Sequence, residues 1–127
     1  MTQPPMAARV LIIEDDQWLA QHYLRILSRE GYDAVTTDKA EQAIDLIDDI
    51  KPQAILLDVL LTGTTALALL HELQSHEDLA QIPIILATNL GDHVAVDDVA
   101  SYGVKKILDK SVMRPEDVTA AIRGVLL

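Results

Sequence analysis

Residues 54–58 read AILLD, an apolar run that ends in a carboxylate. Four apolar side chains in a row are typical of a strand that is buried on both faces, as strands of parallel sheets are. An ionised carboxylate in such a place costs several kcal/mol unless it is paired, solvated or bound to a metal. Asp58 therefore raises the question of which partner holds its charge at the end of a buried strand.

The composition favours one compact domain and narrows the range of partners. The chain has 127 residues, half of them hydrophobic, which is enough for one domain with a core of its own. Ten Lys and Arg against twenty Asp and Glu give a formal net charge of -10, which opposes binding to nucleic acid or to an anionic membrane surface. A basic protein patch or a divalent cation suits this charge better.

Cysteine is absent from the sequence, which excludes disulfides, thiolate zinc sites and a cysteine nucleophile. The apolar run at residues 9–13 is too short for a signal peptide core and meets three acids at once, and no other stretch could span a bilayer. We therefore expect a cytoplasmic protein that contacts neither nucleic acid nor a membrane.

Short runs rich in Ile, Val and Leu alternate along the chain with longer segments whose apolar residues have helical spacing. The short runs predict strands at residues 10–13, 33–37, 53–57, 83–87 and 105–108. The longer segments predict five helices, marked in turn by Leu19, Tyr23, Ile26 and Leu27; by Ala40, Ala43, Ile44 and Ile47; by Leu67, Leu70 and Leu73; by Val96, Val99 and Ala100; and by Val118, Ala121, Ile122 and Val125.

Capping residues mark several of the helix ends. Asp16 and Asp38 are candidate caps for the first and second helices, and Pro115 begins the fifth. Gly31 and Gly103 lie where the first and fourth helices end. Strict alternation of strand and helix predicts an α/β fold, a doubly wound parallel sheet with helices on both faces.

Polar side chains gather at the carboxyl ends of the predicted strands, where ligands bind in sheets of this kind. In chain order they are Glu14, Asp15 and Asp16 after the first strand, Asp58 at the end of the third, Thr88 at the end of the fourth, and Asp109 and Lys110 after the fifth. If the first and third strands are neighbours, Glu14, Asp15 and Asp58 converge. Like charges at that distance raise one another's pKa unless a cation intervenes.

Magnesium is the cation that suits these acids, because it prefers oxygen ligands, needs only one or two carboxylates and is shared with phosphate. Lys110 adds a positive charge and Thr88 a hydroxyl, and both suit phosphate oxygens. Asp58 is therefore a candidate nucleophile that takes a phosphoryl group as an acyl phosphate.

The ordered set of an acid pair, a strand-end Asp, a Thr and a Lys resembles the receiver domain of bacterial two-component response regulators. The resemblance covers the chain from residue 9 to residue 127, after a tail at residues 1–8 that we expect to be loose. It implies a flavodoxin-like sheet of order 2-1-3-4-5. It also implies that Asp58 receives a phosphoryl group from a partner histidine kinase or phosphotransfer protein with the help of magnesium, and releases it slowly.

The resemblance assigns a role to single residues. Thr88 would be the switch hydroxyl and Lys110 the phosphate-binding lysine, while Ile107 stands where the family commonly has an aromatic switch residue. Any signalling rotation at that position would therefore be steric. The implied metal ligands are Glu14, Asp15, Asp58 and the main-chain carbonyl of Leu60.

Three other positions depart from the usual receiver pattern. Pro and Gly usually stand four and eight residues after the acceptor, where this chain has Thr62 and Ala66. A proline usually follows the lysine through a cis peptide, and Ser111 stands there instead. A non-proline cis bond costs about 2.5–4 kcal/mol, so the sequence leaves open whether this peptide is trans or strained.

Two leucines bear on how long a phosphoryl group would stay. In receivers, the side chains two residues after the acceptor and two after the switch Thr flank the approach of the attacking water. Leu60 and Leu90 stand there and cannot hydrogen-bond a water, so we expect slow dephosphorylation.

A candidate docking surface lies beside the acids. Leu19 and Tyr23 define the core stripe of the first helix, which leaves Trp18 and His22, one turn apart, on a more exposed face. In receivers, that part of the helix and the loop after the fifth strand dock the kinase's helical phosphohistidine domain. The expected docking patch is Trp18, His22, Val112 and Met113; inward packing of Trp18 is the other interpretation.

Two other functions stay open. A degenerate receiver would bind a partner without phosphorylation; Ser111 and Ile107 favour it, and the intact acids, Thr88 and Lys110 oppose it. A haloacid-dehalogenase-like phosphatase also uses an aspartyl nucleophile, but that family has a second Asp two residues later, where this chain has Leu60.

Overall fold

The computed structural model describes residues 7–58, 66–89 and 99–126. Its strands are β1 (Arg9–Ile13), β2 (Asp33–Thr37), β3 (Ala54–Asp58), β4 (Ile84–Thr88) and β5 (Val104–Asp109). Its helices are α1 (Gln17–Arg29), α2 (Ala40–Ile50), α3 (Ala66–Gln74) and α5 (Pro115–Leu126), with short 3-10 helices η1 (Leu79–Gln81) and η3 (Ala100–Tyr102).

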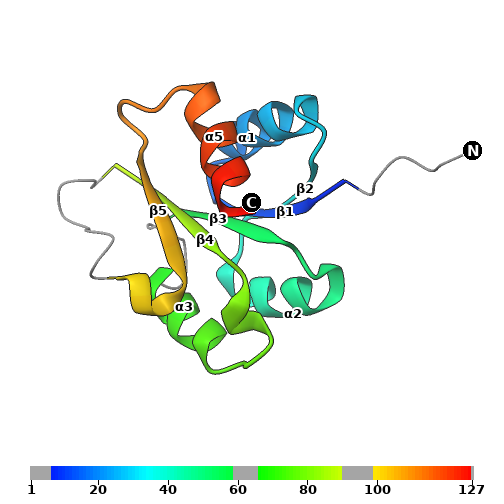
Figure 1. Ribbon diagram of the computed structural model, residues 1–127, viewed down its shortest axis with the longest axis vertical. Coiled ribbons are helices and arrows are strands. Elements are labelled where there is room, and N and C mark those ends of the chain that lie inside the picture. Colours follow the sequence, from blue (N-terminus) through cyan, green and yellow to red (C-terminus); the bar gives the residue numbers. More distant parts are fainter. Residues whose placement is uncertain (1–6, 59–65, 90–98, 127) are drawn as a thin grey trace, which may run out of the picture.

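The strands form one parallel sheet in the order β2-β1-β3-β4-β5. Helices cover both faces, with α1 and α5 on one face and α2 and α3 on the other (Figure 1). Parallel neighbours need long crossovers, which these helices supply. The doubly wound sheet and its strand order are therefore confirmed.

The central strands divide their side chains between two apolar cores. Leu11 and Ile13 of β1 face the core shared with α2 and α3, whereas Val10 and Ile12 face the core shared with α1 and α5. Every residue of β3 is buried, the terminal Asp58 included. Burial of each such Leu, Ile or Val side chain contributes about 1.5–3 kcal/mol, so the packing of β1 and β3 fixes the position of Asp58.

Three of the predicted helix ends are confirmed. The Oδ1 atom of Asp16 accepts a hydrogen bond from the backbone N–H of Leu19 at 3.1 Å and so caps α1. Gly31 follows α1 with a φ of 89°, a conformation that glycine adopts without steric cost. Pro115 is the first residue of α5, where its missing N–H is not needed.

The predicted cap of α2 is wrong. The structure places Lys39 at the N-cap position, and this residue makes no capping hydrogen bond through its side chain. Asp38 lies one residue too early to cap the first turn. Its carboxylate instead accepts a hydrogen bond from Gln17 Nε2 at 3.3 Å.

Several strand boundaries also differ from the sequence prediction: β1 begins one residue earlier than predicted, and β3 and β4 each begin and end one residue later. β5 is longer by one residue at each end than the predicted 105–108, because its pairing with β4 extends from Val104 to Asp109. The predicted fourth helix falls largely on residues 90–98, which lie outside the described part of the chain. The 3-10 helix η3 follows them and ends at Gly103, whose φ is 85°.

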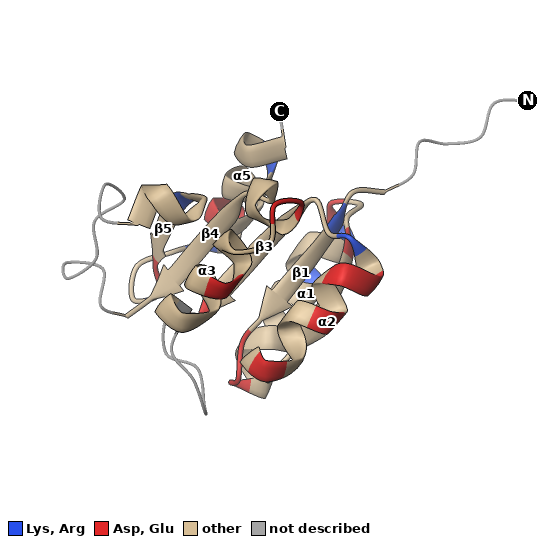
Figure 2. Ribbon diagram, turned by 90° about the horizontal axis from the view of Figure 1, so that it is seen from below, with Lys and Arg blue, Asp and Glu red and all other residues tan. Residues whose placement is uncertain are grey.

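The acidic character of the chain is visible on α2 (Figure 2). Its outer face carries the exposed side chains of Glu41, Asp45, Asp48 and Asp49. In the described ranges, each helix is too short or too polar to cross a bilayer.

Candidate functional site

The pairing of β1 with β3 brings the acids together. Ile13 lies opposite Leu57, so the next residues along the two strands, Glu14 and Asp58, lie side by side at the carboxyl edge of the sheet. The backbone N–H of Glu14 donates to the carbonyl oxygen of Thr37 at 3.0 Å, which holds Glu14 against β2. Both acids are buried, with 2% of Glu14 and 5% of Asp58 exposed.

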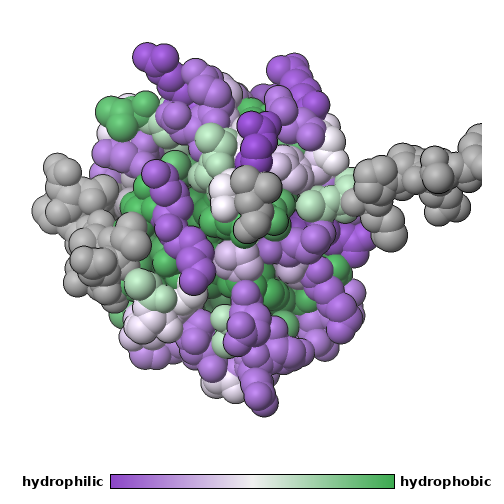
Figure 3. Space-filling view, viewed as in Figure 1, coloured by the Kyte–Doolittle hydropathy of each residue, from purple (hydrophilic) through white to green (hydrophobic). Residues whose placement is uncertain are grey.

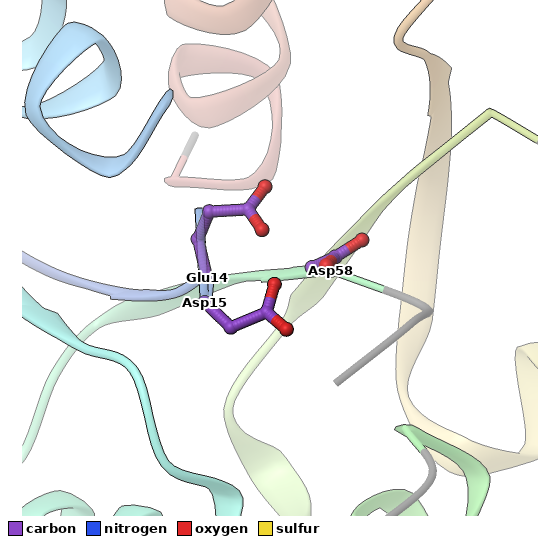
Figure 4. Close-up of side chains that lie close together, drawn as sticks. All are labelled: Glu14, Asp15 and Asp58. Atoms are coloured by element: carbon purple, nitrogen blue, oxygen red, sulfur yellow. The ribbon is translucent and has the colours of Figure 1, made fainter. Parts of the chain in front are cut away.

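Asp15 completes a group of three carboxylates. One oxygen each of Glu14, Asp15 and Asp58 lies within 4.8 Å of the others. Figure 4 shows these side chains at the ends of β1 and β3, with Asp15 reaching toward Asp58. Three oxygen donors this close form a donor set that a hard divalent cation prefers. The sequence prediction that these acids converge is therefore confirmed.

Lys110 is the positive partner of two of these acids. Its Nζ atom donates to Glu14 Oε1 at 2.7 Å and to Asp58 Oδ1 at 2.8 Å. The backbone N–H of Lys110 donates to the carbonyl oxygen of Thr88 at 2.8 Å, which fixes the start of the loop after β5. The partner of the buried Asp58 carboxylate is thus a lysine that follows a strand two places away in the sheet.

One lysine does not balance the acids around it. Burial raises the pKa of Glu14, hydrogen bonding to Lys110 lowers it, and neighbouring Asp58 raises it, with a net rise from 4.5 to about 7. Burial alone would lower the pKa of Lys110, but its hydrogen bonds to Asp58 and Glu14 and their charges raise it. Three carboxylates thus cluster around one lysine amine, an arrangement that favours the binding of a cation.

The Lys110–Ser111 peptide is trans, since the described chain contains no cis peptide bond. Both the backbone N–H and the hydroxyl of Ser111 donate to Asp109 Oδ1, at 2.9 and 2.6 Å. These hydrogen bonds lower the pKa of Asp109. A proline could not make the first of them, so Ser111 gives the loop a different anchor from the usual one.

Thr88 and Ile107, the two predicted switch residues, lie in the neighbouring strands β4 and β5. Thr88 is the last residue of β4 and only 1% exposed, on the strand next to the one that carries Asp58. Ile107 is half-buried in β5 and packs against the core on the α2 and α3 face. The predicted ligand Leu60 and the flanking Leu90 and Thr62 lie outside the described residues; Ala66 begins α3.

The candidate docking patch is exposed at two of its four residues and half-buried at His22 and Met113. Trp18 is 70% exposed and stacks on His22, with ring centroids 5.3 Å apart and planes at 14°. Val112 is 73% exposed, and Met113 is half-buried with its sulfur 4.0 Å from the hydroxyl of Tyr23. The structure thus contradicts inward packing of Trp18.

The sequence interpretation missed a groove along β5 and α5. Its volume is about 730 Å³, and its walls include Leu108 and Val112 from the β5 side and Ala120 and Gly124 from α5. Figure 3 shows apolar surface over β5 and the end of α5, crossed by hydrophilic side chains. The small residues Ala120 and Gly124 lie one turn apart on α5 and were the sequence signal for this groove. They indicate a groove only when β5 is known to be the outermost strand of the sheet.

The comparison with known families decides the assignment. The family model of the response regulator receiver domain matches residues 10–123. This chain belongs to the receiver domain family.

Relatives of this receiver domain are longer proteins. It is 27% identical over 124 residues to the DNA-binding response regulator MtrA of Mycolicibacterium smegmatis, covering 95% of this chain and 51% of MtrA. It is 29% identical over 120 residues to the phosphate regulon transcriptional regulatory protein PhoB of Pseudomonas aeruginosa, covering 92% and 51%. The chain thus spans about half the length of these relatives.

A solved structure agrees with the fold. A candidate response regulator from Chloroflexus aurantiacus superposes with a TM-score of 0.85 at 26% identity, over 94% of this chain and 98% of that one. The receiver fold is therefore shared with an experimental structure.

Proposed function

We propose that this receiver domain takes a phosphoryl group onto Asp58 from the phosphohistidine of a partner kinase or phosphotransfer protein. The observation that carries the proposal is the contact of Lys110 Nζ with both Asp58 and Glu14, at 2.8 and 2.7 Å. It sets a buried carboxylate, a fixed positive charge and a second acid at one point of the sheet. Positioning and charge are what phosphoryl transfer requires of a protein.

In the proposed reaction, a carboxylate oxygen of Asp58 attacks the phosphorus as the bond from phosphorus to the imidazole nitrogen breaks. The partner's imidazole leaves and takes up a proton. Lys110 then has phosphoryl oxygens to bind in place of the carboxylate oxygen it holds now. Thr88 supplies a hydroxyl from the neighbouring strand and acts as the switch residue, while Ile107 follows by steric contact.

Magnesium is the cofactor that we propose for the acid group. Glu14, Asp15 and Asp58 would hold it, with the carbonyl of Leu60 as a further ligand. When bound, the ion neutralises charge on the carboxylates and on phosphoryl oxygens. The raised pKa of Glu14, caused first by burial and then by the neighbouring Asp58 carboxylate, shows that ionised Glu14 is costly here, and a bound cation would offset that cost.

The partly exposed patch of Trp18, His22, Val112 and Met113 is the proposed docking surface for the phosphodonor. Trp18 and Val112 are large apolar side chains that are 70% and 73% exposed, and Lys110 precedes Val112 by two residues. Exposed apolar residues around a polar site are typical of a surface that a partner covers. The net charge of -10 argues that this domain itself does not bind nucleic acid.

The experiment is intact-mass spectrometry after incubation with a small acyl-phosphate donor and magnesium. Wild type should gain one phosphoryl group, and Asp58→Asn should gain none. Asp45→Asn is the matched control, because it removes the same charge from an exposed position on α2. Wild type without the adduct would favour the phosphorylation-independent module, and an adduct on Asp58→Asn would exclude Asp58 as the acceptor.

A further inference from the structure

The hydroxyl of Tyr23 is a buried polar group that phosphoryl transfer does not use. Tyr23 lies on α1 with 1% of its surface exposed. Among the described residues, its hydrogen-bond partner is the thioether sulfur of Met113, at 4.0 Å. A thioether is a weak acceptor, so this buried donor has a poor partner.

Tyr23 stays a donor throughout the ordinary pH range. Burial raises the pKa of its phenol, and the negative charges of Glu14, Asp58 and Asp16 raise it further. Its hydroxyl therefore keeps the proton with which it can bind any better acceptor placed near Met113.

Met113, in contrast, can be reached from solvent. It is half-buried, lies in the loop between β5 and α5, and forms part of the wall of the groove of about 730 Å³. Its neighbour Val112 is 73% exposed. A small oxidant can thus approach Met113 from the groove, and the Met113 sulfur lies 4.0 Å from the buried hydroxyl of Tyr23.

We propose that Met113 is a site of reversible oxidation to the sulfoxide, and that Tyr23 binds the added oxygen. A hydrogen bond between two oxygens spans about 2.7–2.8 Å. The 4.0 Å between the sulfur and the hydroxyl exceeds this by roughly the length of one sulfur–oxygen bond, so the oxygen fits between them when the angle at oxygen is bent.

Hydrogen peroxide is the oxidant of the proposed step. The sulfur lone pair attacks one peroxide oxygen, the O–O bond breaks, and the other oxygen leaves as water after proton transfer. Sulfur loses two electrons and peroxide gains them. Methionine sulfoxide reductases reverse the change.

The sulfoxide would give Tyr23 a strong acceptor and tie α1 more firmly to the loop that follows Lys110. In most cores, oxidation of methionine introduces a polar oxygen without a partner and destabilises the fold. Tyr23 supplies the partner in advance. The proposal concerns Met113 alone and does not depend on phosphorylation of Asp58.

The test treats the folded chain with dilute hydrogen peroxide, maps the sulfoxides by peptide mass spectrometry, and measures Tm before and after. Met113→Leu separates the effect of Met113 from that of the other methionines, Met1 and Met6. Tyr23→Phe removes only the hydroxyl. We expect Met113 to be oxidised, and Tyr23→Phe to lose about 3 °C more in Tm on oxidation than wild type does.

Two results would overturn the proposal. Met113 that stays reduced under peroxide that oxidises free N-acetylmethionine would exclude the modification. An equal loss of Tm in oxidised wild type and oxidised Tyr23→Phe, with Met113→Leu unaffected, would exclude Tyr23 as the partner of the sulfoxide.

Discussion

The parallel strands all begin at one side of the sheet, its amino edge, and end at the opposite side, its carboxyl edge. Each of these two sides carries an ion pair, and the pairs differ in burial. At the amino edge, Arg9 Nε lies 3.0 Å from Asp33 Oδ2, with side chains 39% and 47% exposed. At the carboxyl edge, Lys110 Nζ lies 2.7 Å from Glu14 and 2.8 Å from Asp58, with side chains 12%, 2% and 6% exposed. Water screens the exposed first pair much more than the largely buried second one, so the contacts are similar in length but differ in energy.

The two edges also differ in the balance between positively and negatively charged side chains. Arg9 faces one acid and additionally donates to the carbonyl oxygen of Ile50 at 2.9 Å. Its contacts therefore have a structural role, holding β1 to β2 and to the end of α2. Lys110 faces two acids, with Asp15 close by. A fold built for stability alone gains little from such an imbalance, whereas a site that binds a cation and a phosphoryl group requires it.

The largest expected effect is that of Lys110→Met. The substitution leaves Glu14 and Asp58 buried without their positive partner, and removal of one member of a buried ion pair is strongly destabilising. We expect the free energy of unfolding at pH 7 to fall by about 3 kcal/mol, measured by urea denaturation without divalent cations. A loss no larger than that of Arg9→Met would show that the two edges are energetically alike.

The pH dependence of stability comes next. The pKa of Glu14 is about 7 in the folded chain against 4.5 ordinarily, so the folded state holds a proton that the unfolded state releases between these values. Stability without divalent cations should therefore decrease as pH rises from about 4.5 to 7, by roughly 2 kcal/mol. Glu14→Gln should flatten this part of the curve, and Asp33→Asn should leave it unchanged. A wild-type curve that is flat or rises over this interval would contradict the account.

Magnesium should act on the carboxyl edge alone. At about ten times its dissociation constant, a ligand specific for the folded state adds about 1.4 kcal/mol to the free energy of unfolding. We expect Tm to rise with millimolar magnesium in wild type and in Asp33→Asn, and to rise much less in Asp15→Asn. Equal rises in all three proteins would point to a general salt effect instead of a bound ion.

The smallest effect belongs to the exposed pair. Asp33→Asn removes the partner of Arg9 but leaves the bond of Arg9 to the carbonyl of Ile50. Exposed ion pairs contribute about 0.2–1 kcal/mol and are screened by salt, so the free energy of unfolding should change by less than about 1 kcal/mol. A change of several kcal/mol would mean that Arg9 is paired as strongly as Lys110.

Much of this architecture follows from local patterns in the sequence. Alternating strand and helix signals predicted the parallel sheet, and the position of Asp58 after four apolar residues predicted a buried carboxylate. The roles of Thr88 and Ile107 stay predictions, since their places in β4 and β5 show position and not movement. Strand order followed from the family resemblance, because short apolar runs do not specify which strands are neighbours.

Features that depend on distant contacts could not be predicted. Asp38 precedes an apolar helical stripe and looks like a cap, yet the helix begins one residue later than that role requires. The contact between Tyr23 and Met113 joins residues 90 positions apart, and only the packing of α1 against the loop before α5 creates it. The sequence likewise left open the isomer of the Lys110–Ser111 peptide, which the structure shows to be trans.

The most direct measurement locates the phosphoryl group on the chain. After treatment with the acyl-phosphate donor and magnesium, borohydride reduces an aspartyl phosphate to homoserine, and peptide mass spectrometry then identifies the altered residue. We predict homoserine at position 58 alone, dependent on magnesium and lost in Lys110→Met. Modification at Glu14 or Asp15, or a phosphoryl group gained equally well by the Lys110 variant, would contradict the claim that the buried pair of Asp58 and Lys110 is the phosphoacceptor site.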